Sequence, residues 1–554
     1  MALIRTSHIC IKCRFPQRPI SYSWRRNFIS SAIRLDTFRP PTAPKPTPDV
    51  KHIRQNVELY TQNCIERNNT SHAGYPARIH ELAEEARQLD YDLKAPRSRI
   101  KQLQKSISKL ANAGTGTTTD NAKVEVTGNK DVGITADNGE DEEKTLSALR
   151  SEAQQLKENL HTMTLRRTTC AEEIQQLALS LPNLSSSETP VGNDPKLVGY
   201  INFDPHSPPS WTTSIEAARR RSHVTIGTSL GLIDFTSSAT TTGWGWYFLT
   251  NEGAMLEQAL IQYALSVARQ HGWKIVSPPS IVYSYIADAC GFQPRDQNNE
   301  QQVWSIEQSE KDKSKPQRSL TGTAEIPLAA MYAGRDINAS ELPIKLAASS
   351  RCYRAEAGAR GVDTKGLYRV HEFTKVELFG WTDNLSSILE SHHNHDHEGG
   401  EEQEQITTSH TLFSELLEIQ HKILTSLSLP CRILEMPTTD LGASATRKRD
   451  IEALFPSRLQ TSSNTPADLE TAWGEVTSTS NCSDYQSRRL GTRTRGGDVV
   501  KESRFPHTVN GTALAIPRVL AAIIENGWDE DRQVVVIPEV LRRWMGMDVI
   551  GGNR

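Results

Sequence analysis

The chain has 554 residues, a hydrophobic content of 36% and a formal net charge of −3. This length allows two or three domains and a large core, but the low hydrophobic content indicates that part of the chain is extended, inserted or disordered. The near-neutral charge excludes a protein that binds nucleic acid through its overall charge, so any such contact must come from local basic patches.

Residues 1–45 are predicted to be a mitochondrial targeting segment and a linker. Residues 1–39 carry eight basic side chains against one acid, Asp36, and WRRNFISSAI is amphipathic in character. This composition is typical of a transit peptide to the mitochondrial matrix, the alternative being a disordered basic tail. Cys10 and Cys13 form a CxxC pair without a second pair, so we interpret them as incidental rather than as a metal site. The run PPTAPKPTP at 40–48 predicts a stiff linker, and no run of the chain approaches the ~20 apolar residues of a membrane span.

Residues 50–185 predict a helical hairpin. An amphipathic helix from Lys51 to about Asn69 comes first, and two stripes of apolar residues at mostly 3/4 spacing follow over 82–110 and 149–177. Two such stripes predict an antiparallel coiled coil, and the polar, Gly/Thr/Asn-rich stretch at about 112–142 predicts a disordered tip between them. Pro96 should kink or break the first stripe, and Arg167 interrupts the second.

The first long helix of this hairpin is basic. Between Arg87 and Lys109 it carries seven cations against Asp90 and Asp92. Such a run is usually only a solvated face. On a rigid arm it can also grip an RNA backbone through phosphate contacts, and both interpretations stay open at this point.

Residues 195–554 mix short strands with helices and predict a separate globular domain. The segment 245–282 has the pattern of a strand, a long amphipathic helix and a second strand that ends at Pro278–Pro279. Three polar segments look like insertions, at 308–319, 391–405 and 457–468. The second contains four histidines, but a solvated low-complexity loop is favoured over a metal site because nothing rigid would fix the ligands.

The stretch RCYRAEAGARGVDTKGLYRVHEFTKVELF at 351–379 concentrates charge on one face of a predicted hairpin. Two β-like runs flank a Gly-rich loop, and residues two apart share a face of a strand. Cations, carboxylates and one aromatic ring converge on that face, at Arg354, Glu356, Arg369, His371, Phe373, Lys375 and Glu377, whereas Val370, Val376 and Leu378 lie opposite. An ordinary half-buried strand also alternates in this way. The convergence nevertheless suits a nucleotide, with Arg for phosphate, Phe for a stacked base and Glu for an amine.

Three further segments carry polar groups, each a weak signal alone. Thr323, Ala324 and Glu325 form a turn before Ile326-Pro327, a pattern that is common in proteins. The segment 473–489, WGEVTSTSNCSDYQSRR, alternates small polar residues. The segment 507–527, HTVNGTALAIPRVLAAIIENG, combines a strand-like start with an amphipathic helix that carries an Arg in its first turn. No Gly-rich phosphate-binding motif occurs where a strand and a helix would make it meaningful.

Together and in this order, these segments resemble the seryl-tRNA synthetases of the bacterial and organellar type, which are class II aminoacyl-tRNA synthetases. RAEAG…GLYRVHEFTKVE resembles motif 2, NGTALAIPR resembles motif 3, and the helix at 253–270 with its following strand resembles motif 1. The resemblance runs from about residue 50 to 550. It implies an α+β fold, with an N-terminal antiparallel coiled-coil arm and a catalytic antiparallel β-sheet flanked by helices. It also implies ATP-dependent activation of L-serine and its transfer to the 3′ end of tRNA-Ser, which the arm would bind, by a homodimer built on motif 1.

The resemblance also implies roles for residues. Arg354 should bind the α-phosphate and the serine carboxylate, and Arg518 and Lys375 complete the expected catalytic cations. The residues expected around serine are Thr323, Ala324, Glu325, Arg354, Glu377, Asn510 and Thr512. Those expected around ATP are Arg354, Ala355, Glu356, Arg369, Val370, Phe373, Glu475, Val476, Thr477, Ser478 and Arg518. Glu475 and Ser478 should bind Mg²⁺, a hard cation suited to oxygen ligands.

Two departures and two alternatives accompany this interpretation. Glu372 stands where the family usually has Gln, and RKRDIE at 447–452 lacks a Tyr of the family pattern but keeps Asp450 and Glu452. One alternative is a synthetase-like paralogue that loads a carrier other than tRNA, against which the long basic arm argues. The other is a catalytically inactive RNA-binding homologue, against which the complete set of charged motif residues argues.

Overall fold

The computed structural model describes residues 39–113, 138–292, 302–355, 366–384, 408–460, 468–496 and 503–552. The predicted targeting segment up to residue 38, most of the predicted tip and the His-rich insertion at 391–405 lie outside these residues, as does Glu356. Within them, no helix combines the length and the apolar character needed to cross a membrane.

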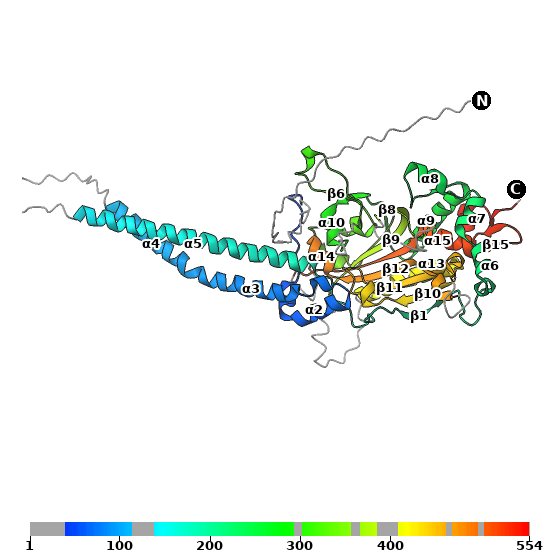
Figure 1. Ribbon diagram of the computed structural model, residues 1–554, viewed down its shortest axis with the longest axis horizontal. Coiled ribbons are helices and arrows are strands. Elements are labelled where there is room, and N and C mark those ends of the chain that lie inside the picture. Colours follow the sequence, from blue (N-terminus) through cyan, green and yellow to red (C-terminus); the bar gives the residue numbers. More distant parts are fainter. Residues whose placement is uncertain are drawn as a thin grey trace, which may run out of the picture. The chain divides into compact units, whose positions relative to one another are not determined.

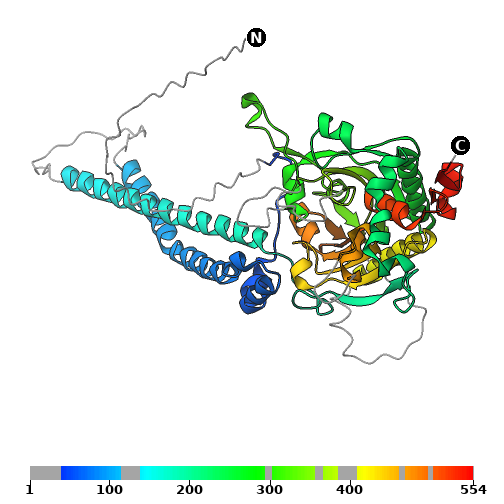
Figure 2. The same ribbon diagram turned by 45° about the vertical axis from the view of Figure 1, so that its right-hand side comes forward.

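The N-terminal region is a set of paired helices, as the stripes predict. Figures 1 and 2 show the longest helix lying alongside two shorter ones. These helices are α1 (Val50–Gln55), α2 (Val57–Glu66), α3 (Tyr75–Asp92), α4 (Lys94–Ala113) and α5 (Asn138–Ser180). Ion pairs between them show the antiparallel sense, because the partner's number falls from Glu173 to Glu152 as the first number rises from Arg78 to Arg99.

The helix boundaries follow local chemistry. The predicted single helix over 51–69 is wrong, because Asn56 leaves helical geometry at φ −130° and ψ 48° and separates α1 from α2. The predicted break near Pro96 is confirmed. Helix α3 ends at Asp92, and Pro96 lies in the first turn of α4, where its missing N–H is least needed.

The apolar stripes face the interior of this coiled coil. Leu82, Leu93 and Leu103 from the first stripe are buried, as are Ala153 and Cys170 from the second. The remaining stripe positions are at least half-buried, whereas Arg167 is exposed at the one place where the pattern breaks. The prediction of an antiparallel coiled coil is therefore confirmed.

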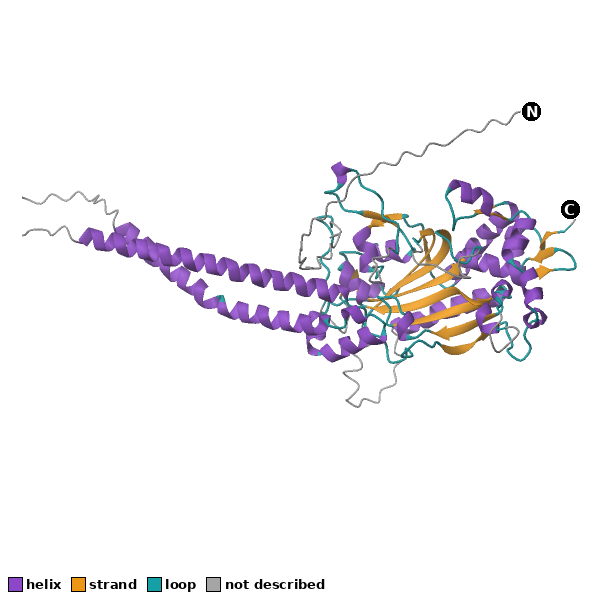
Figure 3. Cartoon of the chain, viewed as in Figure 1, coloured by secondary structure: helices purple, strands orange, loops and turns teal. Residues whose placement is uncertain are grey.

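The C-terminal part is built on an eight-stranded sheet flanked by helices, which confirms the predicted class (Figure 3). The order across the sheet is β1-β10-β11-β12-β14-β9-β8-β4. All neighbouring pairs are antiparallel except β4 with β8 at one edge. The strands are β1 (Lys196–Ile201), β4 (Lys274–Val276), β8 (Ile344–Tyr353), β9 (Glu372–Thr382), β10 (Cys431–Glu435), β11 (Arg447–Leu454), β12 (Trp473–Ser483) and β14 (His507–Ala515).

Two apolar clusters cover opposite faces of strand β9 in this sheet. Val376 and Leu378 point into the larger cluster, which contains residues of α9 (Asn251–Gln270), α13 (Ser409–Ser426) and α15 (Ile516–Asn526). Phe379 and Trp381 belong to the second cluster, with residues of α10 (Ser284–Ala289) and α11 (Glu325–Ala330). The odd-numbered residues of β9 share one face. From Phe373 to Glu377 this face carries predicted site residues, and from Phe379 to Trp381 it packs in a core, which agrees with the alternation in the sequence.

The predicted strand faces hold only within β9 itself. Because β9 begins at Glu372, Arg369, Val370 and His371 precede the strand and are not ordered by its alternation. Val370 packs in a small cluster with Phe373 and Cys352 rather than on the opposite face. The expectation that Val370 shares the core-facing side of this strand is therefore wrong.

Smaller elements complete the C-terminal part. The helix and strand that resemble motif 1 are α9 and β4, and the strand predicted before that helix is β3 (Phe248–Leu249). The end of the predicted insertion at 308–319 belongs to β6, which pairs with β5. The remaining described elements are α6 (Ile215–Arg220), α7 (His223–Ser229), β2 (Ile233–Asp234), α8 (Phe235–Thr241), β5 (Ile281–Tyr283), β6 (Arg318–Leu320), β7 (Asp336–Asn338), α14 (Tyr485–Leu490), β13 (Arg493–Arg495), β15 (Trp528–Asp529), β16 (Val534–Val536), α16 (Glu539–Met545) and β17 (Val549–Gly551).

Candidate active site

One cavity collects most of the residues that the motifs singled out. It lies over β9, β12 and β14 and the start of α15, and its lining comes from segments as far apart as residues 354 and 518. The lining residues are Arg354, Tyr368, Arg369, Val370, Phe373, Lys375, Glu475, Val476, Thr477, Ser478, Thr512, Ala515, Pro517 and Arg518. Of the other predicted residues, Ala355, Thr323, Ala324, Glu325, Glu377 and Asn510 lie outside this lining, and Glu356 lies outside the described residues.

A bulge in β12 brings Glu475 and Ser478 to the same side of the sheet. Residues three apart normally face opposite ways along a strand. Here the register against β11 shifts, so that Glu475 lies opposite Glu452 while Ser478 lies opposite Asp450. Since those two partners are two residues apart, they share a face, and the extra residue in β12 gives Glu475 and Ser478 a common face as well.

Glu475 and Arg518 form an ion pair at the N-terminal end of α15. The Arg518 guanidinium donates to the Glu475 carboxylate at 3.0 Å and to its backbone carbonyl at 2.9 Å. Burial by itself raises the pKa of Glu475, but the positive charges of Arg518, Lys448 and Arg354 outweigh it and lower the pKa to about 2. The Glu475 carboxylate is therefore ionised at neutral pH and can accept from a cation or a hydrogen-bond donor.

The base of the cavity holds a buried ion pair and a cation over a ring. Lys375 Nζ lies 2.7 Å from the Glu377 carboxylate, and the two side chains are only 8% and 1% exposed. Arg354 lies with its guanidinium carbon 5.2 Å from the centre of the Phe373 ring. This places a fixed positive charge beside an aromatic face, a combination that suits a phosphate and a planar base.

A second group of predicted residues forms a polar cluster next to the cavity. Thr512 lies opposite Glu377 in the sheet and donates to its carboxylate at 3.3 Å. Glu325 and Thr323 are buried, and the Glu325 backbone N–H donates to the Thr323 hydroxyl at 3.4 Å. Burial first, and the negative charge of Glu377 second, raise the pKa of Glu325 to about 7. A buried carboxylate that titrates near neutral pH is suited to receive a substrate's ammonium group.

The other two residues predicted around serine have different surroundings. Asn510 is on the same face of β14 as Thr512, and its side-chain oxygen accepts from the Cys482 thiol at 3.4 Å. Ala324 is fully buried in the second apolar cluster. Its methyl group therefore packs against the core, and only its backbone is left to contribute to a binding site.

A second acid stands behind Glu475. Asp450 accepts from Lys448 at 2.7 Å, and burial, opposed by that lysine, raises the pKa of Asp450 to about 7. The RKRDIE segment noted in the sequence thus supplies a buried acid, Asp450, and a partly buried cation, Lys448, whose side chains are 5% and 20% exposed. The pKa of Lys448 is raised as well, because the charges of Asp450 and Glu475 together outweigh the effect of burial.

Tyr368 is a site residue that the sequence did not single out. Its ring has Arg518 at 4.4 Å and Arg458 at 4.3 Å from its centre, and its carbonyl accepts from the Nε of Arg518 at 2.9 Å. Tyr368 therefore fixes the direction of the Arg518 side chain from two sides. Its place in GLYRV, directly before the predicted phosphate-binding Arg369, was the only available signal.

A buried His–Glu pair supports the chain next to Tyr368. His223 Nδ1 lies 2.5 Å from a Glu525 oxygen, and its Nε2 accepts from the Leu367 N–H at 3.0 Å. Since Nε2 accepts, the ring proton is on Nδ1 and the imidazole donates to Glu525. Gly366 adopts φ +69°, and a Cβ at that position would collide with His223. No motif in the sequence pointed to this pair, because its members are about 300 residues apart.

A larger cavity of ≈ 540 Å³ adjoins the first and shares Tyr368 with it. Its lining is mainly apolar and comes from α7, α8, the turn before β3 and the start of the 3₁₀ helix at Pro456–Arg458. Trp244 and Trp246 contribute aromatic rings to it. No functional role was predicted for this region from the sequence.

The described residues contain no group of three or more His, Cys, Asp or Glu side chains that could hold a metal ion. The predicted Mg²⁺ ligands, Glu475 and Ser478, supply one carboxylate and one hydroxyl on the same face of β12. Such a donor set is composed of hard oxygen ligands and fits an ion that takes its remaining ligands from phosphates and water.

The chain is similar in sequence to proteins of one family. Residues 307–527 match the tRNA synthetase class II core domain (G, H, P, S and T). The mitochondrial serine–tRNA ligase of Saccharomyces cerevisiae is 38% identical over 392 residues, which are 70% of this chain and 76% of that protein. The serine–tRNA ligase of Rubrobacter xylanophilus is 32% identical over 509 residues, which are 91% and 99% of the two chains. The mitochondrial serine–tRNA ligase of Schizosaccharomyces pombe is 34% identical over 492 residues, covering 89% and 86%.

Solved structures show the same likeness. The crystal structure of seryl-tRNA synthetase from Pyrococcus horikoshii complexed with ATP superposes with a TM-score of 0.66 at 25% identity. The superposition covers 91% of this chain and 100% of that chain. The cytoplasmic serine–tRNA ligase from Naegleria fowleri in complex with AMP gives a TM-score of 0.67 at 22% identity, covering 92% and 100%. The second likeness bears on the fold alone.

Proposed function

This chain belongs to the class II seryl-tRNA synthetases, and from that premise we propose that it serves translation in the mitochondrial matrix. The basic, serine-containing composition of residues 1–39 supports this location, as does the similarity to two mitochondrial serine–tRNA ligases. We take residues 1–45 as the targeting segment and linker, 50–185 as the tRNA-binding arm and 195–554 as the catalytic domain.

The observation that carries the proposed chemistry is the gathering of motif residues from three strands around one cavity. In the first step, the serine carboxylate attacks the α-phosphate of ATP to give seryl-adenylate and pyrophosphate. Arg354 neutralises both reacting anions and holds them together, because its guanidinium can bond two oxygen groups at once. Lys375 and Arg369 add positive charge around the phosphates, and Arg518 holds the nucleotide from the side of α15.

The adenine of ATP would lie on Phe373. The adenine amine would then be received by Glu356, next to Ala355, while the backbones of Val370, Val476 and Thr477 close the pocket. The guanidinium carbon of Arg354 lies 5.2 Å from the centre of the same ring.

Glu475 and Ser478 would hold Mg²⁺, and the ion would supply charge neutralisation for the phosphates. The low pKa of Glu475 supports this role, because an ionised carboxylate is the ligand that the ion needs. Arg518 shares that carboxylate at 3.0 Å, so the nucleotide, the cation and the α15 arginine would be ordered around one acid.

Serine would bind in the polar pocket formed by Thr323, Glu325, Glu377, Asn510 and Thr512. Two carboxylates next to two hydroxyls and an amide suit an ammonium group and an alcohol on one small molecule. Such a pocket can reject alanine, since an analogue without the hydroxyl leaves buried polar groups unpaired. Ala324 would contribute only through its backbone, because its methyl group is in the core.

A homodimer is proposed from the exposed apolar residues in and around the segment that resembles motif 1. Phe248, Met255, Ile275 and Ile281 are between 43% and 50% exposed, and Ile275 lies on β4, an edge strand of the main sheet. Exposed apolar residues on a strand edge favour association. Ile275→Glu should shift the protein from dimer to monomer in light scattering; a variant that stays dimeric would place the interface elsewhere.

The test of the whole proposal is serine-dependent ATP–pyrophosphate exchange, followed by charging of mitochondrial tRNA-Ser. We expect exchange with serine and not with alanine, and charging of tRNA-Ser. Absence of exchange would refute the enzymatic proposal and favour an inactive RNA-binding homologue. Exchange without tRNA charging would favour a synthetase-like paralogue that loads another carrier.

A further inference from the structure

Helix α14 connects the proposed serine pocket with the base of the arm. It follows directly from β12 and contains six residues, of which only Arg488 is not buried. On one side, the Gln486 amide donates to the Glu325 carboxylate at 2.6 Å. On the other, Arg488 and Arg489 bind segments that belong to the linker and the arm.

Arg489 closes the C-terminal end of the long arm helix α5. Its guanidinium is buried, lies over the Tyr485 ring and donates to the carbonyls of Leu179 and Leu181 at 3.2 and 3.3 Å. These carbonyls are at the end of α5, where the helix dipole is negative and backbone oxygens have no partner within the helix. If the arm moved away, the buried guanidinium would lose those acceptors, which is costly for a charged group.

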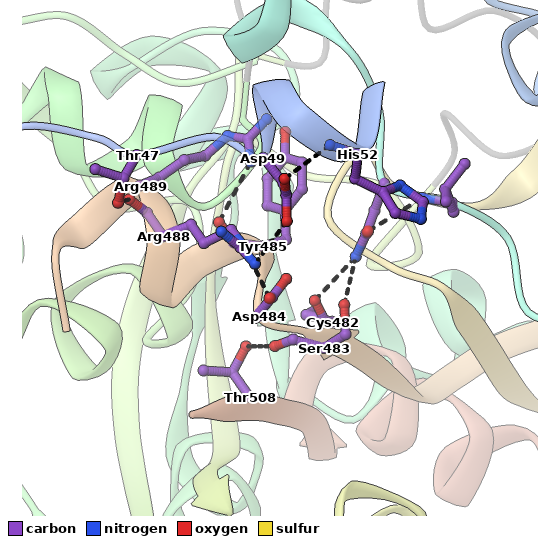
Figure 4. A network of polar contacts seen from close by, with 12 residues as sticks. Thr47, Asp49, His52, Cys482, Ser483, Asp484, Tyr485, Arg488, Arg489 and Thr508 are labelled. Carbon is purple, nitrogen blue, oxygen red and sulfur yellow. Dashed lines mark hydrogen bonds and ion pairs between the residues drawn. The ribbon is translucent and has the colours of Figure 1, made fainter. Parts of the chain in front are cut away.

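Arg488 binds the second segment of this contact, which is the linker before α1. Figure 4 shows its side chain between Asp484 and Asp49, at 2.7 and 3.1 Å. Its carbonyl accepts from the Thr47 N–H at 2.8 Å, while Asp49 also caps α1 by accepting from the His52 N–H at 2.9 Å. The start of the arm is thus bonded to the same helix that carries Gln486.

From this arrangement, we propose that α14 couples the position of the arm base to the serine pocket. Gln486 is the positioning residue that holds Glu325 in place. The inference rests on the proposed function, because it takes Glu325 as a serine-binding carboxylate. A helix of six residues cannot shift at Arg489 without moving Gln486, one turn away. A displacement of about 1 Å is enough to break a short hydrogen bond or to lower a rate strongly.

Gln486 has a specific electrostatic task among the groups that face Glu325. Glu377 on β9, and Cys290 and Cys482 from two other segments, surround this carboxylate, with Lys375 and Arg354 as the neighbouring cations. The amide N–H of Gln486 favours the ionised form of Glu325, which is the form that binds an ammonium group. Loss of this donor would leave Glu325 protonated over a wider pH range.

The first test replaces the amide and measures ATP–pyrophosphate exchange without tRNA. Gln486→Met keeps the length of the side chain and removes the donor. We expect the KM for serine to rise about tenfold, as for the loss of one hydrogen bond to a charged group, with the KM for ATP unchanged. The defect should be largest near pH 7 and shrink toward pH 8.5, where Glu325 ionises without help. If Gln486→Met does not fold, Gln486→Asn, which keeps the amide but does not reach Glu325, serves in its place.

The second test breaks the arm side of α14. Arg489→Lys keeps the charge but loses the planar fork, and we expect a rise of about threefold to tenfold in the KM for serine. Asp49→Asn, at an exposed site, removes the ion pair with Arg488 and should act in the same direction. Thr438→Val is the matched control, because Thr438 bonds the Glu66 carbonyl at the arm base without involving α14. This control should leave the KM for serine within about twofold, since the two neutral hydrogen bonds that it loses, to the Glu66 carbonyl and from the Gly192 N–H, do not involve α14.

The outcomes separate this inference from the proposed function. If the wild-type protein shows no serine-dependent exchange, the proposed function fails. If it exchanges normally and Gln486→Met keeps the wild-type KM and pH profile, the positioning role is refuted while the function stands. If Arg489→Lys and Thr438→Val change the KM for serine equally, or neither changes it, the coupling through α14 is refuted.

Discussion

The arm and the catalytic sheet differ in how far their ion pairs are exposed to solvent. In the arm, cross-helix ion pairs such as Arg166–Glu85 and Arg167–Asp90 lie at the surface, with each partner 37–50% exposed. In the catalytic sheet, Lys375 and Glu377 are 8% and 1% exposed at 2.7 Å from one another. Surface pairs contribute little to stability, whereas a buried pair becomes costly as soon as one partner is lost.

This difference indicates where substitutions matter. The arm needs an apolar stripe and a basic face, and many sequences satisfy both. The catalytic sheet needs particular charges in particular directions before any substrate arrives, which is how positioning and electrostatic stabilisation lower a barrier. The predictions that follow test this contrast.

Arg354→Ala should have the largest effect. The proposed role of Arg354 is to neutralise the α-phosphate and the serine carboxylate together, and no other side chain of the described site lies in the same relation to Phe373. We expect ATP–pyrophosphate exchange to fall by about a thousandfold or more, the size found when a preorganised charge contact to the transition state is removed. Arg99→Ala, which removes an arm ion pair, should leave exchange unchanged. Near-normal exchange by Arg354→Ala would refute its role.

Shortening the arm should affect only tRNA charging. Residues 94–160 can be replaced by a short loop, because the facing ion pairs Asp90–Arg167 and Arg99–Glu152 show that the two ends lie across from each other. The base of the arm and its contacts with α14 remain. We expect charging of tRNA-Ser to fall about a hundredfold through lost phosphate contacts, with serine-dependent exchange retained. Equal loss of both activities would mean that this part of the arm supports the catalytic fold rather than the tRNA.

The third prediction concerns pH and Glu325. Burial and Glu377 raise its pKa to about 7, so the carboxylate is mostly protonated below pH 7 and ionised above it. Because the ammonium of serine is proposed to bind the ionised form, kcat/KM for serine should rise about tenfold between pH 6 and pH 8 and then level off. The measurement is a pH series of exchange rates at low serine concentration. Glu325→Gln cannot titrate and should give a flat, lower profile over this range; a profile as steep as that of the wild type would assign the titration to another group.

The sequence predicts those parts of this structure that depend on local periodicity and on ordered motifs. The apolar stripes at 3/4 spacing predicted the position of the coiled coil, and Pro96 predicted the break between α3 and α4. Alternation along β9 predicted that Lys375 and Glu377 lie on the opposite face from Val376 and Leu378. Each of these is a property of consecutive residues, and neighbouring side chains are enough to determine it.

The parts that the sequence did not predict depend on contacts between distant segments. The bulge that gives Glu475 and Ser478 a common face is visible only in the pairing of β12 with β11. The contact of Tyr368 with Arg458 likewise joins segments that are 90 residues apart, and the hydrogen bond from Gln486 to Glu325 joins segments that are 161 residues apart. No local pattern carries such information, because the partner is chosen by the packing of the whole domain.

The smallest expected effect is at Arg167, the residue that interrupts the arm stripe. Its pair with Asp90 lies at 3.1 Å, with both side chains about half exposed at 47% and 50%. Arg167→Leu restores the stripe and leaves Asp90 in water, so the two changes nearly cancel and the free energy of unfolding should change by no more than about 0.5 kcal/mol. Lys375→Met makes the same kind of substitution at the buried pair and should cost about 3–5 kcal/mol, because Glu377 is left buried and unpaired. Urea unfolding of the two variants measures both values on one scale. Similar costs for the two substitutions would contradict the contrast, because exposure would then not determine what an ion pair contributes in this protein.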